Sequence, residues 1–190
     1  AINNNIGNNP FVIAIPRKEG HVVLDMAMSL YSYGKLEVTR QKGQKLPYAG
    51  GFDTNGNLTD DPAAIELTRR ILPTGYWKGS SLAIVLDLLA GILSKGKTTA
   101  EIDKFGKGNS VGLSQVFLAI DPLKIADQNF IDQSLLKTIE QLRNSTAVDE
   151  TGEIRYPGER SMRTRMQNLK LGIPVDKEVW EKVQNLAKKQ

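Results

Sequence analysis

The chain has 190 residues, of which 40% are hydrophobic and 24% are charged, and its formal net charge is +4. This length suits one well-buried domain or one domain with a small appendage, and the composition excludes a disordered protein. No cysteine is present, which excludes disulfides, thiolate metal sites and a cysteine nucleophile and fits a reducing compartment, so we expect a cytoplasmic protein.

The first predicted elements are two β-rich runs, residues 11–15 and 21–24, separated by a charged turn that contains glycine. They predict two strands joined as a hairpin. Residues 26–36 then change period and predict a helix that leaves the second strand. The stretch 41–61 is rich in Gly, Asn, Asp and Pro, which predicts an ordered loop with at most short hairpins.

The second half of the chain carries the clearest periodic patterns. Residues 81–94 predict a helix that is apolar on nearly every face, so we expect it to be buried and packed on a sheet. Its apolar run is shorter than the roughly 20 residues that cross a bilayer. Residues 112–121 predict a buried strand. Residues 130–143 and 176–189 predict two amphipathic helices, the second capped by Asp176 with Val179, Val183 and Leu186 facing inward.

The stretch 73–81 combines glycines, a lysine and the start of an apolar helix. Gly75 and Gly79 allow a close backbone approach, Lys78 supplies a cation, and Ser80 or Ser81 can cap the helix. Helix N–H groups beside a cation suit an anion, and Trp77 adds a flat apolar face. An ordinary capped helix with a solvated lysine explains the stretch equally well, and both interpretations stay open here.

Most standard catalytic signatures are missing from the sequence, including the glycine-rich dinucleotide fingerprint, the Walker loop and the zinc-binding histidine motif. His21 is the one histidine, and its place inside an apolar strand favours a structural imidazole over a catalyst. Asp25 follows a predicted buried strand, where α/β sheets expose ligand-binding groups. Capping of a following helix at Ala27 or Met28 is the other reading of Asp25.

A series of short motifs carries a resemblance to a known family. The motifs are 7–10 (GNNP), 23–29 (VLDMAMS), 33–35 (YGK), 51–53 (GFD) with Gly56, 60–62 (DDP), 72–79 (LPTGYWKG) and 157–159 (PGE). In order and spacing they resemble the malate/L-lactate dehydrogenase family of NAD(P)H oxidoreductases, over essentially the whole chain. Residues 69–80 resemble most its 2,3-diketo-L-gulonate reductase branch.

The resemblance implies an α/β fold: a three-layer α/β/α arrangement with a mixed sheet, in a non-Rossmann NAD(P)-binding fold that usually forms a homodimer. It implies hydride transfer between NAD(H) or NADP(H) and a small 2-oxo or 2-hydroxy acid. We expect residues 1–150 to form the NAD(P)-binding domain and residues 151–190 a helical segment that completes it. The implied cofactor-binding residues are His21, Val22, Val23, Leu24, Asp25, Met26, Ala27, Trp77, Lys78, Gly158, Glu159 and Arg160.

The resemblance also implies one catalytic role, which falls on Asp25: this aspartate orients a histidine that donates a proton to the substrate carbonyl. In the family that histidine lies in an N-terminal helical region before the part matched here, and His21 does not match its position. We therefore expect the region with the catalytic histidine to be absent from this sequence, and this chain alone not to turn over substrate.

The alternative function is a basic anion-binding or nucleic-acid-binding module without catalysis. Arginines at positions 155, 160, 163 and 165 favour it, but they are too widely spaced for one helical stripe and no aromatic series lies between them. A solvated helix face or a pocket for the 2′-phosphate of NADP explains them equally well. We expect neither a nucleic acid nor a membrane as partner.

Overall fold

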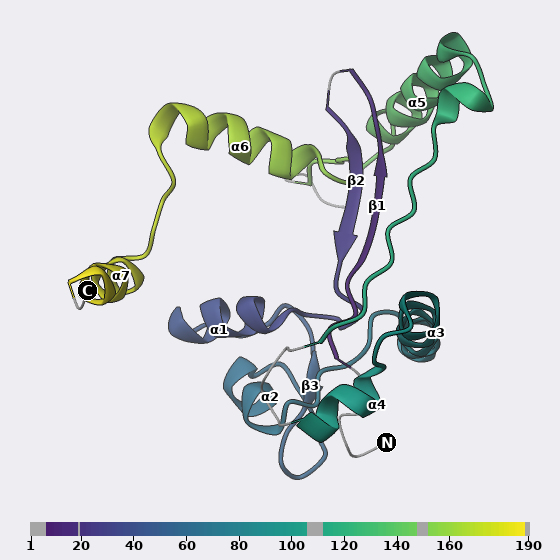
Figure 1. Cartoon of the computed structure of the whole chain (residues 1–190). Coiled ribbons are helices and arrows are strands. Elements are labelled where there is room, and N and C mark those ends of the chain that lie inside the picture. The colour runs from purple at the N-terminus through teal and green to yellow at the C-terminus, as the bar shows by residue number, and fades with distance from the viewer. Residues whose placement is uncertain (1–6, 19, 106–111, 148–151, 189–190) are drawn as a thin grey trace. The chain divides into compact units, whose positions relative to one another are not determined.

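The computed structural model describes residues 7–18, 20–105, 112–147 and 152–188. Helices and short strands are mixed in it, consistent with the predicted α/β class (Figure 1). The elements are β1 (Phe11–Ile15), β2 (Val22–Met26), α1 (Tyr33–Gln41), β3 (Gly51–Phe52), β4 (Leu58–Thr59), α2 (Pro62–Thr68), α3 (Trp77–Ser94), α4 (Thr99–Ile102), η1 (Asp103–Phe105), η2 (Pro122–Lys124), α5 (Gln128–Arg143), α6 (Glu159–Leu171) and α7 (Lys177–Ala187).

The chain forms two compact units. The first unit contains residues 1–12 and 25–121, and the second contains residues 13–24 and 122–190. Strands β1 and β2 form a two-stranded sheet, which confirms the predicted hairpin, with the second strand running two residues further than expected. The functional division after residue 150 stays a prediction.

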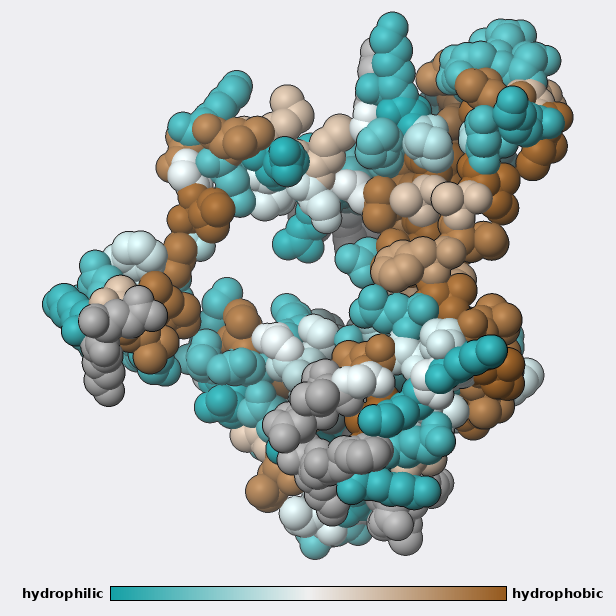
Figure 2. Space-filling view, viewed as in Figure 1, coloured by the Kyte–Doolittle hydropathy of each residue, from teal (hydrophilic) through white to brown (hydrophobic). Residues whose placement is uncertain are grey.

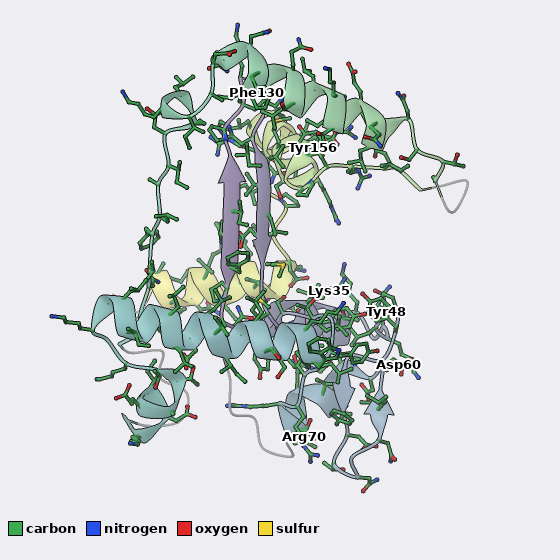
Figure 3. The ribbon with its side chains drawn as sticks, turned by 90° about the vertical axis from the view of Figure 1, so that its right-hand side faces the viewer. Lys35, Tyr48, Asp60, Arg70, Phe130 and Tyr156 are labelled. Carbon is green, nitrogen blue, oxygen red and sulfur yellow. The ribbon has the colours of Figure 1, made fainter. Side chains whose placement is uncertain are left out.

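The core of the first unit is a cluster of four buried residues, Tyr31, Leu36, Leu46 and Ile65. Helices α1 and α2 contribute Leu36 and Ile65, both fully buried. The pattern of the sequence did not predict α2, although Asp61 caps it by accepting a hydrogen bond from the Ala63 N–H at 2.9 Å. Strands β3 and β4 pair as a short antiparallel hairpin, in agreement with the predicted loop that contains short hairpins. Lys35, Tyr48 and Asp60 mark this unit in Figure 3.

The predicted helix over residues 26–36 is wrong for its first seven residues, because α1 begins at Tyr33. The preceding segment contains bends around one isolated bridge between Ser29 and Pro73, and bonds to distant parts of the chain hold it. Leu30 N–H donates to the Leu72 carbonyl at 2.7 Å, and Thr74 N–H donates to the Met28 carbonyl at 2.8 Å. These backbone groups are therefore bonded to partners outside the segment and cannot form helical hydrogen bonds.

Helix α3 is present and begins four residues earlier than predicted, but its predicted burial is wrong. Its buried residues are Gly79, Ala83 and Gly91, whereas most of its large apolar side chains are exposed, up to 72% for Trp77. Figure 2 shows these hydrophobic residues gathered over α3. A helix that is apolar on every side has no single apolar stripe, so its sequence does not indicate which face is covered. In the described structure, the buried residues of α3 are small ones.

The predicted buried strand over residues 112–121 is also wrong. In the described chain this segment has no strand ladder, and its pairing is one isolated parallel bridge between Leu113 and Lys97. Phe117 and Leu118 are exposed by 89% and 85%. A β-rich sequence needs a neighbouring strand to pair with, and the described residues supply none beyond that bridge.

The second unit is mainly helical. Helix α5 confirms the predicted amphipathic helix and buries Ile139. Helix α7 also confirms its prediction, and Asp176 caps it by accepting a hydrogen bond from the Glu178 N–H at 2.9 Å. Its predicted inward face is wrong, because α7 has no buried residue and Leu186 is 68% exposed. The capping signal is local, whereas burial depends on partners elsewhere in the fold.

Candidate functional site

The residues predicted to bind a cofactor fall into two groups, one in each unit. His21 to Leu24 and Gly158 to Arg160 belong to the second unit, and Asp25 to Ala27 with Trp77 and Lys78 belong to the first.

In the second unit, the structure joins the two predicted cofactor segments directly. The Val23 N–H of β2 donates a hydrogen bond to the Pro157 carbonyl at 2.9 Å. Gly158 follows with φ +93, and a Cβ there would lie 3.0 Å from the Val23 nitrogen and 3.2 Å from the His21 carbonyl oxygen. A glycine at this position therefore permits both the left-handed backbone and the close approach of the turn to β2.

Glu159, the next residue, is a buried carboxylate whose two oxygens are already occupied. Oε1 accepts hydrogen bonds from Arg143 Nη2 at 3.0 Å and Arg163 Nη2 at 2.9 Å. Oε2 accepts one from the Tyr156 N–H at 3.3 Å. Because the side chain is only 3% exposed, its oxygens hold the turn from within the unit. The geometry gives Glu159 a positioning role beside the proposed ligand role.

Opposing effects set the charge state of Glu159. Burial raises the pKa of its carboxyl, but hydrogen bonds from Arg143 and the Tyr156 N–H, with the charges of Arg143 and Arg163, outweigh burial. The pKa therefore lies below its ordinary value of 4.5. Glu153, on the surface, pairs with Arg155 and Arg163, and these hydrogen bonds also lower its pKa.

Acid is therefore expected to weaken the second unit. A group whose folded-state pKa is lowered stabilises the fold fully above its unfolded pKa, here 4.5, and this contribution is lost as the pH falls through the folded pKa. Glu159→Gln should lower the urea midpoint at about pH 7 and reduce the further loss between about pH 5 and about pH 3. Urea unfolding followed by circular dichroism at several pH values measures both effects.

Glu153→Gln is the matched control, since it removes another carboxylate from the same group of ion pairs. The Glu153 side chain is 44% exposed. It should have the smaller effect at neutral pH, because solvent screens exposed pairs. Equal losses in the two variants would contradict the role given to the buried carboxylate.

Aromatic and cationic residues that the sequence analysis missed support the same turn. Tyr156 is 5% exposed, and the guanidinium carbons of Arg17 and Arg143 lie 5.7 Å and 5.8 Å from its ring centroid. Figure 3 labels Tyr156. Nη1 of Arg17 is buried and has no hydrogen-bond partner among the described residues. One feature of the sequence could have indicated this aromatic support: Tyr156 directly precedes the Pro-Gly-Glu motif.

His21 has a structural contact, as predicted. It precedes β2, and its Nδ1 accepts a hydrogen bond from the Arg17 N–H at 3.1 Å. This bond closes the turn between β1 and β2. The imidazole is exposed, so its predicted position inside a buried strand is wrong.

In the first unit, Trp77 and Lys78 form the start of α3. Lys78 Nζ lies 5.9 Å from the centroid of the Trp77 ring, a cation–π distance, and both side chains are exposed. The predicted caps Ser80 and Ser81 are wrong, because the helix begins at Trp77 and its N-cap is Tyr76, which makes no side-chain capping bond. The exposed pair offers a charge and a flat apolar face to a ligand.

Asp25 lies within β2 and is exposed. It caps no helix, since α1 begins only at Tyr33 and the Met28 N–H donates instead to the Asn8 carbonyl at 2.9 Å. Within the described part of the chain, the Asp25 side chain has no hydrogen bond or ion pair. Its carboxylate oxygens are therefore free to accept hydrogen bonds.

The described residues differ in how far they meet the requirements of a metal site and of a membrane-spanning helix. The described residues contain no group of three His, Asp or Glu side chains that could hold a metal ion. Among them, α3 is the one helix that could cross a membrane by length and composition, which is weak support because core helices of soluble proteins pass the same test.

Comparison with known proteins gives a consistent family. The model for malate/L-lactate dehydrogenase matches residues 1–184. A 2,3-diketo-L-gulonate reductase of Citrobacter koseri is 45% identical over 181 residues, which cover 95% of this chain and 54% of that protein. The solved sulfolactate dehydrogenase of Methanocaldococcus jannaschii is 28% identical with a TM-score of 0.74, covering 96% of this chain and 52% of that one.

A malate dehydrogenase of Entamoeba histolytica superposes with a TM-score of 0.84 at 20% identity, covering 94% of this chain and 54% of the other. At that identity the likeness concerns the fold alone. This chain spans about half the length of the relatives that it matches.

Proposed function

We propose that this chain, which belongs to the malate/L-lactate dehydrogenase family, is the cofactor-binding part of an NAD(P)H-dependent oxidoreductase acting on a 2-oxo or 2-hydroxy acid. The observation that carries the proposal is the hydrogen bond from the Val23 N–H to the Pro157 carbonyl. It joins two segments, far apart in the sequence, that were both assigned to the cofactor by the family motifs.

The residues present fit a nicotinamide cofactor. Gly158 lacks a Cβ where the turn meets β2, so the turn can lie directly against β2 and bring the two predicted cofactor segments together. Lys78 offers a cation to a phosphate, and Trp77 offers a flat surface for a ring. We assign cofactor binding to His21–Ala27, Trp77, Lys78, Gly158 and Arg160, and positioning of the turn to Glu159. When bound, the nicotinamide would supply the hydride.

The chain's own catalytic contribution is Asp25. Its exposed carboxylate can accept a hydrogen bond from an imidazole and stabilise the protonated form, which then serves as an acid toward the substrate carbonyl. His21 is not given that role, because it does not match the position of the family's histidine. We propose that the histidine comes from outside the residues described here.

Further parts of the proposal rest on the family. They are a three-layer, non-Rossmann arrangement completed around the described elements, a homodimeric assembly, a small 2-oxo acid as substrate, and a cytoplasmic location. The many large apolar side chains that are exposed, among them Val85, Ile92 and Phe117, are consistent with further packing partners.

Titration with NADH, followed by nucleotide fluorescence, tests the proposal. The native chain should bind saturably, and Lys78→Ala should weaken binding about tenfold, because one charge-assisted hydrogen bond is lost. Lys42→Ala is the matched control: this lysine is exposed in the same unit, at the end of α1, and its removal should leave the affinity unchanged. A folded chain that binds neither NADH nor NADPH would overturn the proposal.

A further inference from the structure

Helix α6 has two chemically different faces. Glu159 and Arg163 lie on one face, where Glu159 also pairs with Arg143, and Met162 on the same side lies against Gly20. The other face borders an open groove of about 770 Å³, and its polar lining residues are Arg160, Ser161, Thr164, Arg165 and Asn168. The pairs Arg160–Thr164, Ser161–Arg165 and Thr164–Asn168 are each four residues apart, so the members of each pair are neighbours on the helix surface.

The arginines at the two faces differ in whether an acidic side chain pairs with them. On the packed face, Arg143, Arg155 and Arg163 all pair with Glu153 or Glu159. On the groove face, Arg160 and Arg165 have no ion pair with any residue that the structure describes. The groove lining contains no acidic residue. Two guanidinium groups are therefore left to attract an anion in a groove that also offers hydroxyl and amide donors.

The groove also has an apolar side, formed by Leu169 and by Ile173 beyond the end of α6. Both side chains are 75% exposed. Guanidinium groups bind phosphate in a bidentate way, and apolar side chains or guanidinium planes cover an aromatic base. The volume of the groove lies within the range of cofactor sites. These features together suit a base that carries a phosphate nearby.

The groove begins at the residue where the proposed cofactor site ends. Arg160 follows the Gly158–Glu159 turn, and that turn is bonded to β2 through the Pro157 carbonyl. We infer that the α6 groove binds the phosphorylated adenosine end of the cofactor, with Arg165 and Arg160 holding a 2′-phosphate, so that the chain prefers NADPH to NADH. This inference rests on the proposed function and adds the identity of the cofactor.

Titration of the native chain and of Arg165→Gln with NADPH and with NADH tests it, at one fixed ionic strength. The native chain should bind NADPH at least tenfold more tightly than NADH, and Arg165→Gln should remove most of that difference while leaving NADH affinity within about twofold. Lys170→Gln removes the same charge from the same helix at a position outside the groove lining, and it should change neither affinity.

Competition identifies the phosphate that is recognised. Adenosine 2′-monophosphate should displace NADPH more effectively than adenosine 5′-monophosphate or inorganic phosphate. Equal displacement by all three would show a general anion site and overturn the inference. Equal affinity for NADH and NADPH, or equal effects of Arg165→Gln and Lys170→Gln, would overturn the inference and leave the proposed function standing. Failure to bind either nucleotide would overturn both.

Discussion

Gly79→Ala is expected to destabilise the first unit more than any other single methyl addition in the described helices. A Cβ at position 79 would lie 1.7 Å from the Thr74 carbonyl oxygen and 2.8 Å from its carbon. These are backbone atoms, and Thr74 is held in turn by its N–H bond to the Met28 carbonyl. Relieving the overlap must move the start of α3 or break that bond, at a cost of about 3 kcal/mol. Urea unfolding followed by circular dichroism measures the loss.

The control is Gly34→Ala in α1, where a Cβ would meet no atom within 4 Å. Alanine is favoured over glycine inside a helix by up to about 1 kcal/mol, so this variant should be neutral or slightly more stable. Similar losses in the two variants would contradict the close packing at Gly79. Because Trp77 and Lys78 form the same first turn of α3, Gly79→Ala should also weaken NADH binding.

Gly158→Ala is expected to damage both stability and nucleotide binding. Its backbone has φ +93, a conformation that costs a residue with a side chain about 1–2 kcal/mol. The new methyl would also press on the Val23 nitrogen and the His21 carbonyl oxygen and push the turn away from β2. We expect a total loss of about 2–3 kcal/mol and at least tenfold weaker binding of the preferred nucleotide. Denaturant unfolding and fluorescence titration measure the two effects.

Gly56→Ala separates the backbone cost from the contact. Gly56 has φ +84, but a Cβ there would meet nothing within 4 Å, and it lies in the hairpin between β3 and β4. The Gly56→Ala variant should lose only the free energy that a positive φ costs a residue with a side chain, and it should keep native nucleotide affinity. If both variants lost the same free energy of unfolding and bound nucleotide equally well, the contact between Gly158 and β2 would contribute to neither stability nor binding, and the prediction would be wrong.

The arginines of the second unit show why charge alone was ambiguous in the sequence. Arg155, Arg160, Arg163 and Arg165 appear there as one basic segment. In the structure, Arg155 and Arg163 are neutralised by Glu153, whereas Arg160 and Arg165 line the groove. This division reduces the support for a nucleic-acid-binding module, which needs a continuous basic surface.

The candidate site was predictable as a set of motifs but not as a set of contacts. Residues 21–27 and 158–160 were assigned together through family resemblance, and the bond between Val23 and Pro157 brings part of each segment together. The occupied oxygens of Glu159 were not predictable, because its partner Arg143 lies at the end of another helix. The contacts of the buried Tyr156 were not predictable either, because Arg17 and Arg143 lie far from it in the sequence.

The sequence by itself determined the features that depend on neighbours a few residues away. The β1–β2 hairpin, helix α5 and the Asp176 cap of α7 follow from alternation, periodicity and capping, which are local. The tertiary structure alone decided the non-helical form of residues 27–32, the lack of a strand ladder at 112–121 among the described residues, the exposure of α3 and the ion pairs of Glu159. Each depends on which distant group meets a backbone N–H, an apolar face or a charge, and such pairings are formed only when the chain folds.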